Sequence, residues 1–260
     1  MLPGKPKVTS VAEAAAMMTA PDDSSKYNAG ILPRMLDEVP DYAIRLLNNS
    51  HDGFIIVDKY TMRVILYDPY GCVRKEYKMA CSKHYGTKHK KADNRTPEGF
   101  FCIEGIYDST DWLYTDDDGK VSDVKGQFGP KFLRLKIPVT SQIGIHGTCA
   151  PWSLGGRRSH GCIRISNENI LELAELVEPG MPVIVSPGRR DMAVNEEEGY
   201  DIPAVSTGKI RPTPLPLPKK EEPTDSVSVA SPDSVAAKSS EIPVEAVTDS
   251  ITISNDTIPA

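Results

Sequence analysis

Short runs of β-branched and aromatic residues, separated by turn residues, occupy the chain from residue 54 to residue 186. Such runs favour strands over helices, because branched and aromatic side chains pack well on a pleated surface. Turn signals such as Asp68-Pro69-Tyr70-Gly71 stand between them. The pattern predicts a single, mainly β domain, folded as a sandwich or a barrel-like sheet. The predicted strands are Phe54–Val57, Met62–Tyr67, Val73–Met79, Phe100–Tyr107, Phe132–Ile137, Ile143–Ile145 and Met181–Ser186.

Two segments show helical spacing instead. Residues 34–50 carry apolar side chains three and four positions apart, and so do residues 167–177. Ser166 or Asn167 is suited to cap the start of the second helix, and Pro179-Gly180 ends it. The sequence therefore predicts one or two helices that accompany the β domain.

The composition changes on both sides of this domain. Residues 1–33 are small, polar and aperiodic, which predicts a flexible segment. Beyond residue 188 the chain is rich in Pro, Ser and acidic residues, a composition typical of a linker and a disordered tail. We therefore expect a flexible segment at 1–33, a helix at 34–50, the folded domain at 51–187 and a disordered tail at 188–260.

A thiol, two imidazoles and several glycines come together in the segments Ile145-His146-Gly147-Thr148 and Ser159-His160-Gly161-Cys162-Ile163-Arg164. A cysteine attacks a carbonyl as the thiolate, and its free pKa of about 8.5 means that it needs a nearby base or cation at neutral pH. His146 ends a predicted strand, so rigid backbone would hold its ring in place. These residues predict an acyl-transfer site with Cys162 as the nucleophile and His146 as the base.

The backbone around the thiol is suited to stabilise negative charge. Gly161 lets the chain turn without a Cβ, so consecutive N–H groups around His160, Gly161 and Cys162 are expected to form an oxyanion hole. Arg164 and the N-terminus of the helix that follows would both favour the thiolate over the thiol.

Each of these residues also has a plainer interpretation. A cysteine in an apolar setting is often only a small hydrophobic side chain, and we favour this for Cys72, Cys81 and Cys102. His160 is also a candidate for a structural histidine that bonds to backbone. A zinc site is a sharper alternative, although structural zinc ligands are usually spaced more widely than His160 and Cys162. Its four ligands would be His146, Cys149, His160 and Cys162.

The composition argues against some classes of protein. The formal net charge is -6, from 30 basic and 36 acidic residues, which does not suit a general nucleic-acid binder. No stretch approaches the roughly 18 to 20 apolar residues of a transmembrane helix, and no clear signal peptide is evident. Five cysteines are an odd number, so at least one is expected to stay outside any disulfide.

Charged residues gather in two predicted loops. A basic loop carries Lys83, His84, Lys88, His89, Lys90, Lys91 and Arg95, and an acidic loop carries Asp111, Asp116, Asp117, Asp118 and Asp123. Solvated loop surface is the plain explanation for both. The alternative is that the basic loop flanks the cleft and attracts a carboxylate-rich polymer.

The two segments around the thiol resemble the active-site signature of the L,D-transpeptidase catalytic domain family, also called the YkuD domain. The resemblance rests on His146-Gly147-Thr148 and on Ser159-His160-Gly161-Cys162-Ile163-Arg164, with support from Thr96-Pro97-Glu98-Gly99-Phe100. It covers residues 51–187 and implies an L,D-transpeptidase-like fold, with Cys162 as nucleophile and His146 as proton acceptor and donor. It also implies a site without metal or cofactor, whose oxyanion and substrate contacts come from His160, Gly161, Ser159, Arg164 and Gly147.

The resemblance further implies a reaction and a location. The family attacks the carbonyl of the third residue of a peptidoglycan stem peptide, releases the terminal D-alanine and passes the acyl group to an amine of a second stem. The expected partners are therefore peptidoglycan stem peptides, and the expected location is the cell envelope, the periplasm or the exterior. Water can accept the same acyl group, so an L,D-carboxypeptidase or an amidase stays open. A non-catalytic peptidoglycan-binding module is a further alternative, and the sequence predicts no oligomeric state.

Overall fold

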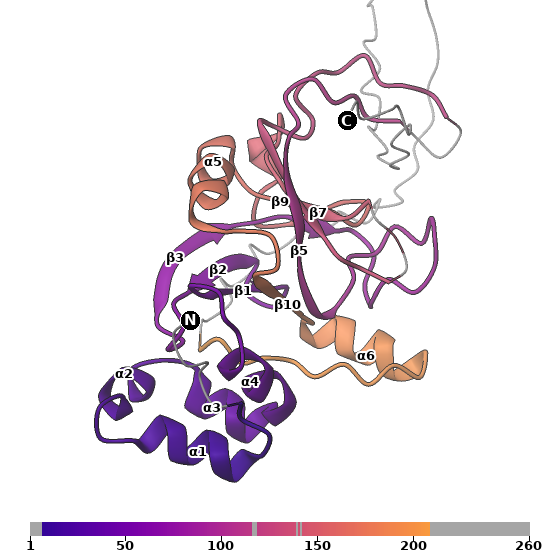
Figure 1. Ribbon diagram of the computed structural model, residues 1–260. Helices are drawn as coiled ribbons and strands as arrows, with labels where there is room; N and C mark the ends of the chain where they lie inside the picture. The colour runs from indigo at the N-terminus through magenta and orange to yellow at the C-terminus, as the bar shows by residue number, and fades with distance from the viewer. Residues whose placement is uncertain (1–6, 116–118, 139, 141, 209–260) are drawn as a thin grey trace, which may run out of the picture. The chain divides into compact units, whose positions relative to one another are not determined.

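The strands form one curled eight-stranded sheet and one two-stranded sheet, which confirms the predicted mainly β domain (Figure 1). The computed structural model describes residues 7–115, 119–138, 140 and 142–208. The large sheet has the strand order β3-β2-β1-β10-β5-β6-β7-β9. Its strands are β1 Phe54–Asp58, β2 Arg63–Tyr67, β3 Val73–Lys78, β5 Gly99–Asp108, β6 Lys131–Leu135, β7 Gly144–His146, β9 Ile163–Arg164 and β10 Pro182–Ser186. The small sheet pairs β4 Cys81–Ser82 with β8 Arg157–Ser159 in parallel.

The centre of the large sheet is buried on both faces. Strand β10 lies between β1, to which it is parallel, and β5, to which it is antiparallel. Successive side chains of a strand point to opposite faces. Accordingly, Ile55 and Val57 belong to one hydrophobic core, whereas Phe54 and Ile56 belong to another. The first core contains the residues around Cys162, so the sheet separates the candidate site from the second core.

Helices near the N-terminus cover the second core, which corrects the prediction of a flexible segment for residues 7–33. They are α1 Val11–Thr19, α2 Ser24–Asn28, α3 Leu32–Glu38 and α4 Pro40–Leu47. The side chains of Met18, Tyr27 and Leu32 are buried against the sheet or against one another. Each helix is short and buries only a few residues, so its stability comes from packing that local periodicity does not reveal. The predicted helix at 34–50 is divided between α3 and α4.

The helix after the Cys162 segment agrees with the prediction. It is α5 Asn167–Leu176, and the Ser166 side chain accepts a hydrogen bond from the Asn169 N–H at 3.2 Å. A second helix, α6 Arg189–Glu197, lies in the stretch for which a tail was predicted. Its mostly charged sequence suggests an exposed segment, although Asp191 and Asn195 are buried. Of the predicted tail, residues 209–260 lie outside the described residues.

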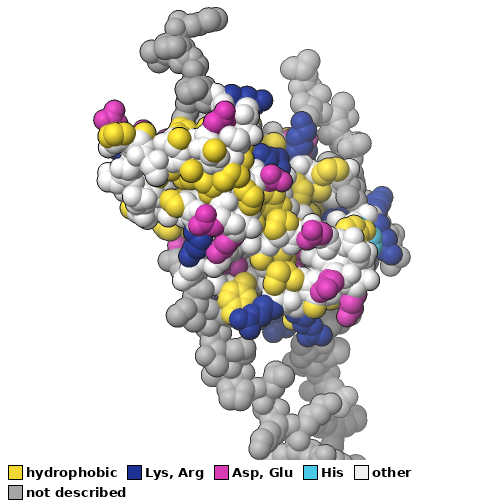
Figure 2. Space-filling model, turned by 90° about the horizontal axis from the view of Figure 1, so that it is seen from below, with side chains coloured by type: hydrophobic (Ala, Val, Ile, Leu, Met, Phe, Trp, Pro, Cys, Tyr) yellow, Lys and Arg dark blue, Asp and Glu magenta, His cyan; other side chains and the backbone are white. Residues whose placement is uncertain are grey.

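One face of the molecule carries both apolar and charged side chains. Figure 2 shows hydrophobic side chains in the middle of the face seen from below, with acidic and basic side chains around them. Within the described residues, no helix has the length and apolar character needed to cross a membrane.

Candidate active site

Strands β7 and β9 bring the two predicted site segments next to each other. They are parallel neighbours, with Ile145 opposite Ile163 and His146 opposite Arg164. Cys162 immediately precedes β9, and so it lies beside the strand that ends at His146. Neighbouring strands are about 4.8 Å apart, so residues that are far apart in the sequence become adjacent in space.

The hydrogen bond of His146 determines which ring nitrogen carries the proton. Its Nδ1 lies 2.6 Å from the carbonyl oxygen of Gly147. A carbonyl oxygen only accepts hydrogen bonds, so Nδ1 donates and the neutral ring carries its lone pair on Nε2. Phe132 stacks on the ring with 5.4 Å between centroids and 10° between planes, which fixes its orientation. His146 therefore presents a proton acceptor in a fixed position.

Burial keeps this imidazole neutral. Only 2% of His146 is exposed, and desolvation together with the positive charge of Arg164 lowers its pKa from 6.5 to about 3. The carbonyls of Gly147 and Phe128 oppose the shift without cancelling it. At neutral pH the ring is thus able to accept a proton, and no standing positive charge is present on it.

Cys162 is also almost completely covered. It is 2% exposed and belongs to the first hydrophobic core. Its Sγ donates a hydrogen bond to the carbonyl oxygen of Gln142 at 3.6 Å. The thiol is thus held inside the domain.

The turn before Cys162 is held by Ser159. The Ser159 hydroxyl donates to the Cys162 carbonyl at 2.6 Å and accepts from the Gly161 N–H at 3.2 Å. The Gly161 N–H, which we expected to be an oxyanion donor, is therefore engaged within the turn. It would serve an oxyanion only after leaving the Ser159 hydroxyl.

Gly161 is required by its conformation and by its surroundings. Its φ of 136° is one that side chains with a Cβ rarely adopt. A Cβ on Gly161 would lie 2.7 Å from Ile143 Cδ1 and 3.0 Å from the carbonyl oxygen of Arg95. The loop that contains Arg95 therefore packs directly against the backbone of the Cys162 segment.

His160 lies among positive charges. It is 8% exposed, and burial lowers its pKa to about 3, with further contributions from Lys83, Arg164 and His84. Lys83, His84 and Arg164 thus lie close enough to His160 to lower its pKa in the same direction as burial does. A neutral His160 contributes shape and hydrogen-bonding capacity, and no charge.

Gly147 makes room for a residue that the sequence analysis did not assign to the site. Asn167, the first residue of α5, accepts a hydrogen bond from the Thr148 N–H at 2.8 Å through its side-chain oxygen. A Cβ on Gly147 would press on this oxygen and would lie 2.9 Å from Gly129 Cα. Asn167 thus anchors the segment that follows His146. The only signal in the sequence was its position at the start of a helix.

The basic loop contacts the Cys162 segment through its backbone. The Lys83 N–H donates to the Ser159 carbonyl at 3.0 Å. Two of the loop's cations are matched by carboxylates, because Lys88 binds Asp93 at 2.6 Å and Arg95 binds Glu198 at 2.8 Å. The basic charge is therefore only partly available to a ligand. Of the acidic loop, Asp116, Asp117 and Asp118 lie outside the described residues.

The positions of the cysteines show whether disulfides form and whether the zinc alternative holds. None of the five cysteines forms a disulfide. Cys81 is buried, Cys72 and Cys102 are half-buried, and Cys149 is exposed. Within the part of the chain that the structure describes, no three or more His, Cys, Asp or Glu side chains are grouped as metal ligands. The four residues considered for zinc therefore do not form such a group.

The sequence as a whole assigns the chain to a family. Residues 52–185 match the L,D-transpeptidase catalytic domain (YkuD) family, and the chain belongs to this family. The YkuD protein of Bacillus licheniformis is 44% identical over 62 residues, which are 24% of this chain and 36% of that protein. The YqjB protein of Bacillus subtilis is 27% identical over 108 residues, which are 41% of this chain and 60% of that protein. The chain thus spans about a third of the length of the YkuD protein.

Two of the solved structures that the chain matches are L,D-transpeptidases. One is the catalytic domain from Enterococcus faecium acylated by ertapenem, with 25% identity and a TM-score of 0.40 over 53% of this chain and 98% of that chain. The other is from Mycobacterium smegmatis, with 20% identity and a TM-score of 0.38 over 52% of this chain and 58% of that chain. The sequence match confirms the predicted family, and it supports an enzyme function of the L,D-transpeptidase type.

Proposed function

We propose that the chain is a cysteine-dependent L,D-transpeptidase that acts on peptidoglycan stem peptides through a thioester on Cys162. The observation that carries the proposal is the His146–Gly147 hydrogen bond, which leaves Nε2 as a proton acceptor on the strand beside Cys162. A neutral imidazole next to a thiol is the arrangement that nucleophilic catalysis by cysteine requires.

In the acylation step, the Cys162 thiol gives its proton to Nε2 of His146 as the sulfur attacks the carbonyl of the third stem residue. The tetrahedral intermediate collapses when the bond to D-alanine breaks, and His146 returns the proton to the leaving amine. The products are a Cys162 thioester and free D-alanine.

In the transfer step, an amine of a second stem attacks the thioester carbonyl. His146 takes the proton from that amine and returns it to the departing sulfur, which regenerates the thiol. The net result exchanges one amide bond for another, so no oxidant, metal or cofactor is needed.

The depressed pKa of His146 shapes this mechanism. An imidazole with a pKa of about 3 does not form a stable imidazolium beside the thiol before substrate binds. We therefore propose that the proton moves during the attack, and that Arg164 helps by stabilising negative charge on sulfur and substrate oxygen. In the proposed site, His160 and the Cys162 backbone shape the oxyanion position. Ser159 and Gly161 form the turn before Cys162. Gly147 leaves room for the Asn167 side chain.

Family membership also supports a proposal for location and partners. Peptidoglycan stem peptides occur in the cell envelope, and so we propose that the protein works there or outside the cell. The remaining positive charge of the basic loop, for example on Lys83, would favour the approach of carboxylate-bearing stems.

The test is incubation of the full chain with muropeptides that carry tetrapeptide stems, followed by mass analysis of the products. Cross-linked dimers and free D-alanine are expected from the wild type and from Cys149→Ser. Cys162→Ser should lower turnover by orders of magnitude, because serine is a much weaker nucleophile beside a base suited to a thiol. If tripeptides form without dimers, the reaction is hydrolysis and the proposed transpeptidation is wrong. Binding without any product would favour the peptidoglycan-binding module.

A further inference from the structure

Helix α6 lies beyond the residues that match the family, yet it contributes completely buried polar groups to the domain. The family match ends at residue 185, whereas α6 spans Arg189–Glu197. Asp191 is 0% exposed and Asn195 is 1% exposed. Burying a carboxylate and an amide is unfavourable unless both are fully hydrogen-bonded, so their partners show what the helix holds.

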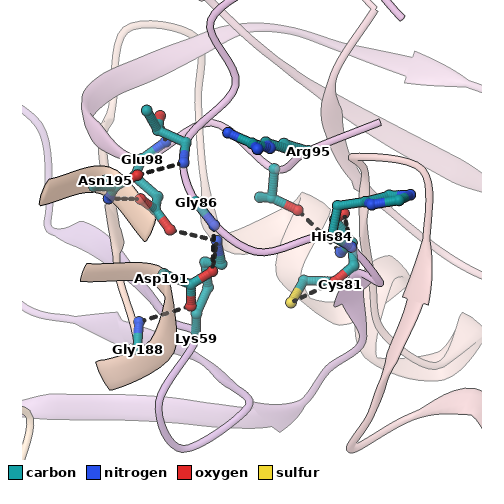
Figure 3. A network of polar contacts seen from close by, with 12 residues as sticks. Lys59, Cys81, His84, Gly86, Arg95, Glu98, Gly188, Asp191 and Asn195 are labelled. Carbon is teal, nitrogen blue, oxygen red and sulfur yellow. Dashed lines mark hydrogen bonds and ion pairs between the residues drawn. The ribbon is translucent and has the colours of Figure 1, made fainter. Parts of the chain in front are cut away.

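Asp191 joins three separate parts of the chain, and Figure 3 shows it beside Lys59, Gly86 and Gly188. Its Oδ1 lies 2.8 Å from Lys59 Nζ and accepts from the Gly86 N–H at 3.0 Å. Its Oδ2 binds the guanidinium of Arg157 and accepts from the Gly188 N–H at 3.0 Å. The carboxylate thus ties the turn after β1, the basic loop and strand β8 to α6.

Asn195 and Glu198 add contacts to the basic loop. The Asn195 side-chain oxygen accepts from the Thr87 N–H at 2.7 Å, and its amide donates to Glu98 Oε2 at 2.6 Å. Glu198 follows the helix and binds Arg95 through both carboxylate oxygens. Lys59, whose side chain has no exposed area, also binds Glu98. Two residues of α6 and the residue that follows it therefore hold the loop at residues 83–98.

The two segments held in this way are those that flank the Cys162 segment. The carbonyl oxygen of Arg95 is packed against Gly161, as the space around that glycine shows. Strand β8 begins at Arg157 and ends at Ser159, whose hydroxyl orders the turn before Cys162. A shift of the loop or of β8 would be transmitted to this turn through backbone contacts.

We propose that α6 is a positioning element of the active site, in which Asp191, Asn195 and Glu198 hold the loop at 83–98 and strand β8 against the Cys162 segment. This role in catalysis rests on the function proposed above. These three are positioning residues, because they act on Cys162 through other groups and touch neither the thiol nor His146 in the described contacts. Misplacement of a reacting group by about 1 Å is enough to lower a rate by about two orders of magnitude.

The test compares two neighbouring glutamates with the same substitution. Glu198→Gln removes the charge that holds Arg95, whereas Glu197→Gln removes an equal charge from an exposed position. Asn195→Ala is a third variant that removes the hydrogen bonds of the Thr87 N–H and of Glu98 Oε2. For each protein, three quantities are measured at a temperature where it is fully folded: kcat and KM with a tetrapeptide stem, amide exchange at Thr87, and the iodoacetamide alkylation rate of Cys162 relative to that of exposed Cys149.

We expect kcat to fall about tenfold or more in Asn195→Ala and by a smaller factor in Glu198→Gln, with Glu197→Gln equal to the wild type. Faster exchange at Thr87 and a changed ratio of Cys162 to Cys149 alkylation should accompany the loss in Asn195→Ala. If Asn195→Ala only lowers the melting temperature and leaves kcat, exchange and alkylation unchanged in the folded protein, the positioning role is wrong. A wild type that is not acylated would contradict the proposed function instead, and exchange and alkylation would still decide whether α6 positions the Cys162 segment.

Discussion

Lys59 and Asp191 form a completely buried ion pair, with 2.8 Å between the lysine Nζ and Asp191 Oδ1. The pair joins the turn after β1 to α6, so two segments that are far apart in the sequence meet in the interior. Removing one partner of a buried pair usually costs about 3–5 kcal/mol, because the other charge stays buried without compensation. The folded domain therefore cannot end where the family match ends.

We expect a chain that ends at residue 208 to unfold cooperatively at nearly the wild-type temperature. A chain that ends at residue 187 should lose about 3–5 kcal/mol of unfolding free energy or fail to fold, because Lys59 then lacks Asp191. The shorter chain also lacks Val205, whose N–H donates to the Ser186 hydroxyl at 2.9 Å. Thermal and urea unfolding of both chains measures the difference. Equal stability of the two chains would show that α6 is dispensable.

We expect Gly161→Ala to destabilise the fold by about 1–3 kcal/mol and to abolish acylation, because its φ is unsuited to alanine and Arg95 stands in the way. Gly156→Ala, close by in the chain, is the matched control. A Cβ there would meet only the Ser153 carbonyl oxygen at 3.6 Å, an ordinary contact distance. Urea unfolding compares the two variants, and equal effects would refute the argument from backbone conformation.

We expect His146→Ala to impair acylation more than His160→Ala, because proton transfer is assigned to His146 and mainly shape to His160. A general acid–base group commonly contributes about 10² to 10⁴ in rate. Single-turnover kinetics with a tetrapeptide stem measures both variants, after melting curves have shown that both are folded. If the order of severity were reversed, the two roles would have to be exchanged.

The pKa of His146 predicts how stability changes with pH. Its pKa is about 3 in the folded protein and near 6.5 in the unfolded chain, so the unfolded chain binds more protons between these values. The free energy of unfolding should therefore fall as pH drops from about 6.5 towards 3, by up to about 1.4 kcal/mol per pH unit from this residue. The contribution is fully present above pH 6.5.

His146→Asn removes the titrating group and keeps an amide that is able to bond to the Gly147 carbonyl. Urea unfolding at pH 7.5 and pH 4.5 should show a smaller loss of stability for the variant than for the wild type. His160 shifts in the same direction and is present in both proteins, so it cancels in the comparison. Parallel pH profiles would contradict the depressed pKa of His146.

The strands and the Cys162 segment were predictable because their signals are local. Runs such as Ile55 to Val57 are branched and apolar on successive residues, as expected for a strand with both faces buried. The segment around Gly161 combines a thiol, a histidine and a residue without Cβ. Packing alone rarely requires this combination, so it indicates a reactive site. The residue types predicted a cap for α5 at Ser166 or Asn167, and Ser166 is the residue that caps it.

The missed features depend on distant partners. In α6, Asp191 and Asn195 look like solvent-facing residues until Lys59, Arg157 and the basic loop surround them. Tyr27 is buried because it joins the second hydrophobic core, where its ring lies 5.1 Å from the ring of Tyr70. The engagement of the Gly161 N–H by Ser159 likewise depends on a turn geometry that the sequence does not specify. Such features follow from tertiary packing, which no periodicity records.

Intact-protein mass spectrometry with a tetrapeptide stem that ends in D-alanine decides whether Cys162 is the nucleophile. We expect an adduct on Cys162 equal to the stem minus its terminal residue. It should be present in Cys149→Ala, absent from Cys162→Ala and discharged when an amine acceptor is added. An adduct that persists in Cys162→Ala, or a wild type that binds stems and never forms one, would contradict this expectation.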